Sequence, residues 1–179
     1  MEIDEQTRSP TPTPDPSPSS KRSTDSATTP PSPSVASPST LYLEDLDDSL
    51  IVTEPRRVSE SQGRATINGV EYLDSLLYEY HNCSECEGSL EFIVPEGYSR
   101  LTGTVGLEDS SRHDDVIDGI VNFAVYDTSG NQIFPTTVIE YPEAVPVDVR
   151  ISGQTRLRIE MTRGTNFETF VLGDMALVK

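Results

Sequence analysis

The chain has 179 residues, of which 30 are acidic and 13 are basic, so its formal net charge at neutral pH is −17. A surface this anionic repels nucleic acid and anionic lipid, whose binding needs basic patches. No apolar stretch is long enough to span a bilayer. We therefore expect neither nucleic-acid binding nor membrane insertion, and the simplest explanation of the acidity is solubility.

Residues 1–40 differ in composition from the rest of the chain. They hold nine of the fourteen prolines and seventeen Ser or Thr, but no aromatic residue. Such a segment cannot bury enough surface to offset its ordering entropy. The composition predicts a disordered Pro/Ser/Thr-rich linker over residues 1–40 and one folded domain over residues 41–179.

The compartment is left open by the sequence. The start MEIDEQTRSP has no basic, apolar signal-peptide pattern. A Ser/Thr/Pro stalk before a β domain is nevertheless typical of extracellular or cell-surface proteins.

The remaining residues are patterned as strands. In chain order we expect a hairpin at Asn68-Gly69, followed by strands that give about nine in all and no helix. These strands lie at 76–80, 89–94, 99–107, 121–127, 131–139, 145–151, 155–162 and 170–178. The turn signals DTSGN and SGQT separate neighbouring strands at the short spacing of antiparallel pairs. The pattern predicts an all-β fold, an antiparallel β-sandwich of jelly-roll type.

Alternation along the strands predicts which side chains face the core. It is clearest in TRLRIEMT, where Leu157, Ile159 and Met161 should point inward and Arg158 outward. The same pattern predicts that Val145, Val147, Val149 and Ile151 share one face.

The order of the motifs carries a resemblance to a known family. The motifs are LYLEDLD, RATINGVEYLDSLLYEY, YSRLTGTVGLEDSS, NFAVYDTSGNQIF, VPVDVRISGQTRLRIEMT and GDMALVK. Together they resemble the NPCBM domain, a family of carbohydrate-binding modules, over residues 41–179. The resemblance implies a non-catalytic β-jelly roll of the kind often attached to glycosidases or surface proteins, some members of which bind galactose-type sugars. We therefore expect a binding module and not an enzyme.

The resemblance also directs attention to one rim of the sandwich. Family members with a demonstrated sugar site share a loop-borne Trp near the last strand, whereas this chain has no Trp. The stacking role then falls to Phe167 or Tyr126, because the C–H face of a pyranose packs on an aromatic ring. Hydrogen bonds to the hydroxyls would come from Asn166, Glu168, Glu108 and Asp109.

Two alternatives to sugar binding stay open. The domain is a protein-interaction or structural surface module if the rim offers no aromatic-lined notch. Phe167 also has a structural interpretation, because a segment such as TNFETF more often enters a strand with its Phe buried.

Other polar groups have competing interpretations. The acidic loop LEDSSRHDD has the oxygen ligands that Ca²⁺ prefers, but its spacing matches no EF-hand, and no cofactor is expected. Cys83 and Cys86 predict a short-loop disulfide if the protein is exported and two free thiols if it is not. A zinc site would need His81 and His113 as further ligands.

Overall fold

The structure is a computed structural model, and it describes residues 39–55, 59–80, 87–111, 119–163 and 169–179. These residues belong to one compact unit that comprises Ala36–Lys179. The linker predicted over residues 1–40 lies outside the described residues apart from Ser39 and Thr40. Among the residues that the structure describes, no helix is long and apolar enough to cross a membrane.

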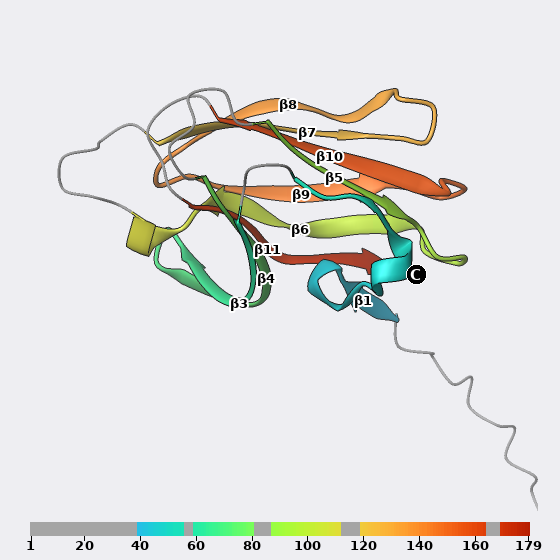
Figure 1. Cartoon of the computed structure of the whole chain (residues 1–179), viewed down its shortest axis with the longest axis horizontal. Helices are drawn as coiled ribbons and strands as arrows, with labels where there is room; N and C mark the ends of the chain where they lie inside the picture. Colours follow the sequence, from blue (N-terminus) through green and yellow to red (C-terminus); the bar gives the residue numbers. More distant parts are fainter. Residues whose placement is uncertain (1–38, 56–58, 81–86, 112–118, 164–168) are drawn as a thin grey trace, which may run out of the picture. The chain divides into compact units, whose positions relative to one another are not determined.

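Two antiparallel β-sheets pack face to face (Figure 1). Sheet A has the order β3-β4-β11-β6-β9, with β1 also paired to β11, and sheet B has the order β2-β5-β10-β7-β8. The strands of sheet A are β1 (Thr40–Tyr42), β3 (Ser59–Ile67), β4 (Val70–Glu79), β6 (Arg100–Leu107), β9 (Ala144–Arg150) and β11 (Thr169–Val178). The strands of sheet B are β2 (Ile51–Thr53), β5 (Glu87–Ile93), β7 (Ile120–Tyr126), β8 (Gln132–Glu140) and β10 (Arg156–Arg163). The all-β sandwich predicted from the sequence is confirmed.

Three short 3-10 turns accompany the strands, and the described ranges contain no α-helix. They are η1 (Leu43–Asp45), η2 (Asp48–Leu50) and η3 (Asp109–Ser111). The eleven strands of the described ranges exceed the nine expected, because β1 and β2 are only three residues long and leave no alternation to read.

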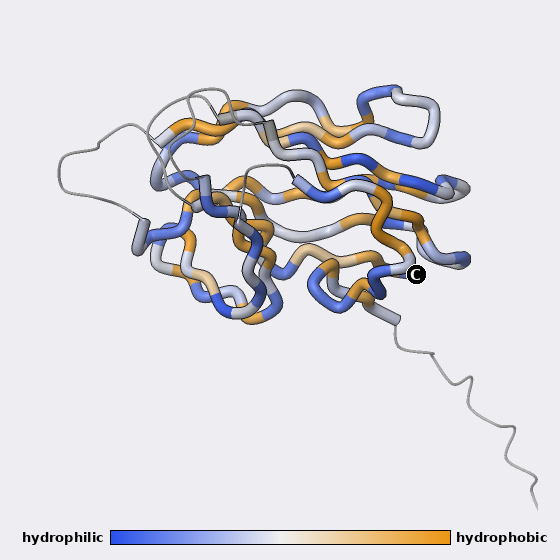
Figure 2. The backbone as a smooth tube through the Cα atoms, in the orientation of Figure 1, coloured by the Kyte–Doolittle hydropathy of each residue, from blue (hydrophilic) through white to orange (hydrophobic). Residues whose placement is uncertain are grey.

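The main core lies between the two sheets. Leu157, Ile159 and Met161 of β10 are fully buried in it, as their alternation predicts. Figure 2 shows hydrophobic residues concentrated along the strands and hydrophilic residues in the turns. Val145 packs against the same core but stays partly exposed, near the start of β9, which is one of the edge strands of sheet A.

The β3–β4 hairpin forms a second, smaller cluster that includes Val171 of β11 and Ala144 of β9. Two side chains of the hairpin come close to the backbone of neighbouring strands at glycines, which have no side chain in the way. A Cβ on Gly106 would lie 2.3 Å from Ile67, and a Cβ on Gly173 would lie 2.8 Å from the Tyr72 ring. Both glycines are therefore required for the hairpin side chains Ile67 and Tyr72 to pack on β6 and β11.

Where β11 bulges, its backbone is fastened to the same hairpin. The register between β11 and β6 shifts between Gly173 and Ala176, and Asp174 has the left-handed φ of 45°. One carboxylate oxygen of Asp174 accepts hydrogen bonds from the N–H groups of Leu73 (2.8 Å) and Asp74 (3.0 Å). The bulge thus gives hydrogen-bond partners to two β4 amides.

The start of the described chain is paired with its end. Thr40 lies opposite Val178, and Lys179 donates its N–H to the carbonyl of Ser39 at 3.2 Å. These contacts tie the first described residues to the central strand of sheet A.

Candidate functional site

One rim of the sandwich collects the ends of β6 and β10 and the starts of β7 and β11. Leu107, the last residue of β6, lies opposite Phe170 near the start of β11, and Glu108 donates its N–H to the carbonyl of Thr169 at 3.1 Å. In sheet B, Arg163 at the end of β10 lies opposite Val121 at the start of β7. We call this edge the rim, and its described part in sheet A comprises residues 107–111 and 169–170.

Asp109 on the rim binds the tip of the β3–β4 hairpin. Its two carboxylate oxygens accept hydrogen bonds from the N–H groups of Asn68 (3.0 Å) and Gly69 (2.8 Å). Asn68 and Gly69 both have positive φ, 51° and 75°, as the predicted two-residue turn requires. Asp109 therefore connects the rim to sequence about forty residues upstream.

Glu108 is held within its own turn. Its carboxylate accepts hydrogen bonds from the N–H of Ser110 at 2.6 Å and from the Ser110 hydroxyl, while its carbonyl accepts one from the Ser111 hydroxyl at 2.7 Å. These bonds order η3. A carboxylate oxygen has two lone pairs, so both Glu108 and Asp109 keep acceptor capacity for a ligand.

Several residues singled out in the sequence, three as sugar ligands and the others as disulfide or metal candidates, lie outside the described residues. They are Asn166, Phe167, Glu168, Cys83, Cys86, His81, His113, Asp114 and Asp115. Within the described ranges no group of three or more His, Cys, Asp or Glu side chains is arranged to hold a metal ion.

The structure does not bring Tyr126 to Glu108 and Asp109. Tyr126 ends β7 opposite Arg158, whereas Val121 stands at the rim end of the same strand. Five residues of extended chain separate the two positions by about 16 Å. Figure 1 accordingly shows the β7–β8 turn at the opposite edge of the sandwich from η3. One small sugar cannot contact all of these residues.

Tyr126 instead belongs to a charged group on the outer face of sheet B. The Arg158 guanidinium lies 4.7 Å from the centre of its ring and pairs with Glu160 at 3.2 Å. Burial raises the pKa of the Tyr126 phenol, and its hydrogen bond and charge interaction with Glu160 raise it further. The phenol is therefore uncharged at neutral pH.

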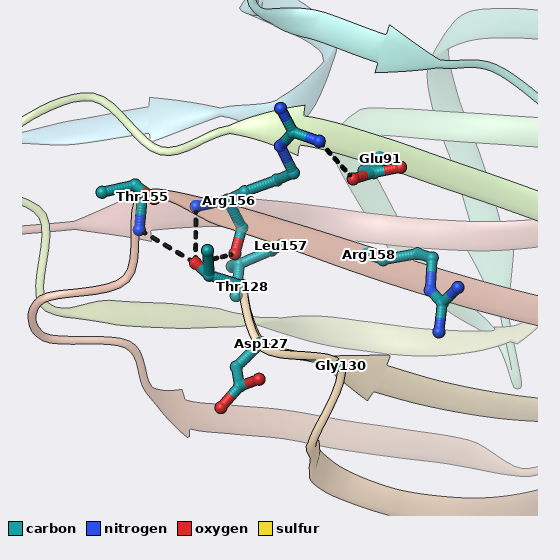
Figure 3. Close-up of a pocket in the computed structure, with 8 residues that line it drawn as sticks. All are labelled: Glu91, Asp127, Thr128, Gly130, Thr155, Arg156, Leu157 and Arg158. Carbon is teal, nitrogen blue, oxygen red and sulfur yellow. Dashed lines mark hydrogen bonds and ion pairs between the residues drawn. The ribbon is translucent and has the colours of Figure 1, made fainter.

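Beside this group lies a pocket of about 290 Å³ that sequence reasoning missed. Figure 3 shows its lining, which comes from β5, β10, the turn between β7 and β8 and the turn between β9 and β10. The sequence identified DTSGN and SGQT as turns and Arg158 as outward-facing. No local pattern indicated that the two turns meet.

Comparison with known proteins agrees with this architecture. The topology and core define an all-β sandwich of the kind found in binding modules. Residues 52–178 match the NPCBM/NEW2 domain, and the chain belongs to that family. Comparison with curated protein sequences found no significant match.

Solved structures with a similar fold include several CBM51 modules. The CBM51-2 and INT domains of Clostridium perfringens ZmpB match at 14% identity and a TM-score of 0.60, over 79% of this chain and 32% of that one. The CBM51 of Clostridium perfringens GH95 in complex with methyl-galactose matches at 17% identity and a TM-score of 0.57, over 78% of this chain and 99% of that one. Tandem CBM51 modules of a Streptococcus pneumoniae family 98 glycoside hydrolase match at 20% identity and a TM-score of 0.55, over 77% and 46%. This chain thus spans only 32% of the ZmpB fragment, and these similarities establish the fold.

Proposed function

We propose that residues 39–179 form a non-catalytic carbohydrate-binding module that recognises a neutral, galactose-like sugar at the rim. Membership of the NPCBM/NEW2 family carries the proposal. It is supported by the similarity in fold to a CBM51 whose structure contains methyl-galactose.

In the proposed mechanism, the pyranose stacks on Phe167 while Asn166 and Glu168 bind its hydroxyls. Glu108 and Asp109 offer further carboxylate acceptors, already oriented by Ser110 and by the hairpin amides. An open rim removes little ligand surface from water, so the dissociation constant should be on the order of 0.1 to 1 mM.

A titration followed by amide NMR tests the proposal. Galactose or lactose should shift the signals of Glu108, Asp109 and residues 165–169 in the full chain. Phe167→Ala should abolish the shifts without unfolding the domain. Tyr98→Ala is the matched control, because Tyr98 is a partly buried aromatic residue that packs near the Lys179 ammonium, 5.4 Å from its ring centre.

A protein-interaction or structural role is the second candidate function. The observation that favours it is the exposure of two apolar side chains of β4, Val70 (53%) and Leu73 (49%), on the β3–β4 hairpin. If the amide signals of the rim do not change in a folded sample at tens of millimolar sugar, the galactose proposal is contradicted and this second candidate is favoured.

A further inference from the structure

The pocket on the outer face of sheet B is pre-formed by hydrogen bonds between its two turns. The Thr128 hydroxyl accepts from the N–H groups of Thr155 (3.2 Å) and Arg156 (3.1 Å) and donates to the Arg156 carbonyl (3.1 Å). The Thr128 N–H donates to the Gln154 side-chain carbonyl at 3.2 Å. Figure 3 shows Thr128 at the centre of this arrangement.

A second set of bonds keeps the β7–β8 turn rigid. Asp127 accepts hydrogen bonds from the N–H groups of Ser129 and Asn131, both at 2.8 Å, and from the Asn131 side chain at 3.0 Å. The hydrogen bonds from Asn131 hold the pKa of Asp127 below its ordinary value. Asp127 is therefore ionised at neutral pH. Because the turn is already held by these hydrogen bonds, the lining needs no rearrangement to bind a ligand.

The charges that line the pocket balance one another. The lining holds Arg156 and Arg158 against Glu91 and Asp127, and Glu160 beside the pocket pairs with Arg158 at 3.2 Å. Arg156 pairs with Glu91 at 3.0 Å, and both side chains remain partly exposed. A guanidinium carries five N–H groups, and this ion pair engages one of them, so Arg156 keeps donors for a ligand.

This pattern selects the chemistry of a ligand. An anion would meet the carboxylates of Glu91 and Asp127 on a chain of net charge −17, and a cation would meet two arginines. Neighbouring hydroxyl groups suit the site, because each hydroxyl can accept from a guanidinium and donate to a carboxylate. The volume is close to the lower end of about 300 Å³ found for ligand pockets, which suits a single small ring.

We propose that the pocket between Thr128, Arg156 and Glu91 is a second sugar site, specific for a neutral vicinal diol and separate from the rim. This inference rests on the proposed function in so far as both concern sugars. The two sites lie at opposite edges of the sandwich, so one titration tests them independently.

The experiment is an amide and Arg side-chain NMR titration of the full chain with methyl β-D-galactopyranoside. We expect saturable shifts at Thr128, Gly130 and Thr155 and at the Arg156 side chain. Arg156→Gln should weaken binding at these signals about tenfold, because a hydrogen bond to a charged group is lost. Arg100→Gln is the matched control, since Arg100 forms an exposed ion pair with Asp148 on sheet A, and it should leave the shifts unchanged.

A second variant tests the charge argument. Sodium glucuronate should not bind the native pocket, whereas Glu91→Gln removes a carboxylate that repels the anion and frees the Arg156 guanidinium of its partner, so this variant should bind glucuronate. Stronger shifts with glucuronate than with the galactoside in the native chain would overturn the assignment to a neutral ligand.

The remaining outcomes separate this inference from the proposed function. Rim shifts without pocket shifts at tens of millimolar galactoside would overturn the second site and leave the rim site standing. Pocket shifts without rim shifts would support the second site and contradict the rim site. The absence of both in a folded sample would overturn both.

Discussion

Gly69 donates its backbone N–H to the carboxylate of Asp109 at 2.8 Å, across a separation of 40 residues. With Asn68 bound to the other oxygen, one side chain on the rim holds the tip of the β3–β4 hairpin, whose side chains pack with Val171 of β11. Asp109, the last residue of TVGLED, therefore stabilises the hairpin whether or not it also binds a ligand.

Asp109→Ala should destabilise the domain by about 1 to 3 kcal/mol, because two backbone amides lose a charged acceptor. Urea unfolding followed by circular dichroism measures the change. Asp45→Ala, at an exposed carboxylate of η1, is the control and should cost less than about 0.5 kcal/mol. Equal losses in the two variants would show that solvent replaces the hairpin contact.

Asp174 combines a left-handed backbone with two hydrogen bonds, and substitutions can separate these contributions. Asp174→Gly loses the bonds to Leu73 and Asp74 but tolerates a φ of 45°. Asp174→Ala loses the bonds and also places an alanine in the left-handed conformation, which is unfavourable for a residue with a Cβ. It should therefore be less stable than the glycine variant by about 1 to 2 kcal/mol. Denaturant midpoints compare them, and an alanine variant as stable as the glycine variant would mean that the bulge relaxes.

Leu157→Ala should destabilise the domain by about 2 to 5 kcal/mol, because Leu157 is fully buried between the sheets and its removal leaves a cavity. Arg158→Ala, on the outer face of the same strand, should cost less than about 1 kcal/mol even with its contact to Tyr126 lost. Chemical denaturation ranks the pair, and the reverse order would contradict the register of β10.

Glu44 should make stability depend on pH. Burial raises the pKa of Glu44, and the neighbouring Asp74 and Asp45 raise it further. Since the folded state holds this proton more tightly than the unfolded state, stability falls as pH rises from the ordinary value near 4.5 to the higher folded value.

Glu44→Gln should therefore stabilise the domain at pH 7 and bring little gain at pH 4. Melting temperatures at the two pH values measure the difference. Asp48→Asn, at an exposed carboxylate of η2, is the control. A gain that is the same at both pH values would rule out ionisation of Glu44 as the cause.

Truncation should show that the Pro/Ser/Thr segment is not needed for the stability of the domain. Deletion of residues 1–35, which hold no aromatic residue and few sizeable apolar side chains, should leave the melting temperature within about one or two degrees. Deletion through Tyr42 removes β1 and its pairing with β11, and should lower it by more. A large drop with the shorter deletion would show that residues 1–35 support the domain.

Local patterns were sufficient for the strands and for much of the core. In β10 the side chains alternate with a period of two, and Leu157, Ile159 and Met161 are buried as that period requires. The turn at Asn68-Gly69 was equally predictable, because few residue pairs adopt positive φ twice in succession. These features depend on neighbours in the chain, so the sequence by itself determined them.

The contacts between distant segments were decided only by the tertiary structure. Nothing near Asp109 indicates that its carboxylate binds Gly69, and nothing near Tyr126 places it far from Glu108. Thr128 and Arg156 are brought together by the pairing of β7 with β10, and the polar pocket exists only because that pairing aligns two turns. Alternation tells which face of a strand is buried, whereas sheet order and register determine which side chains become neighbours across the fold.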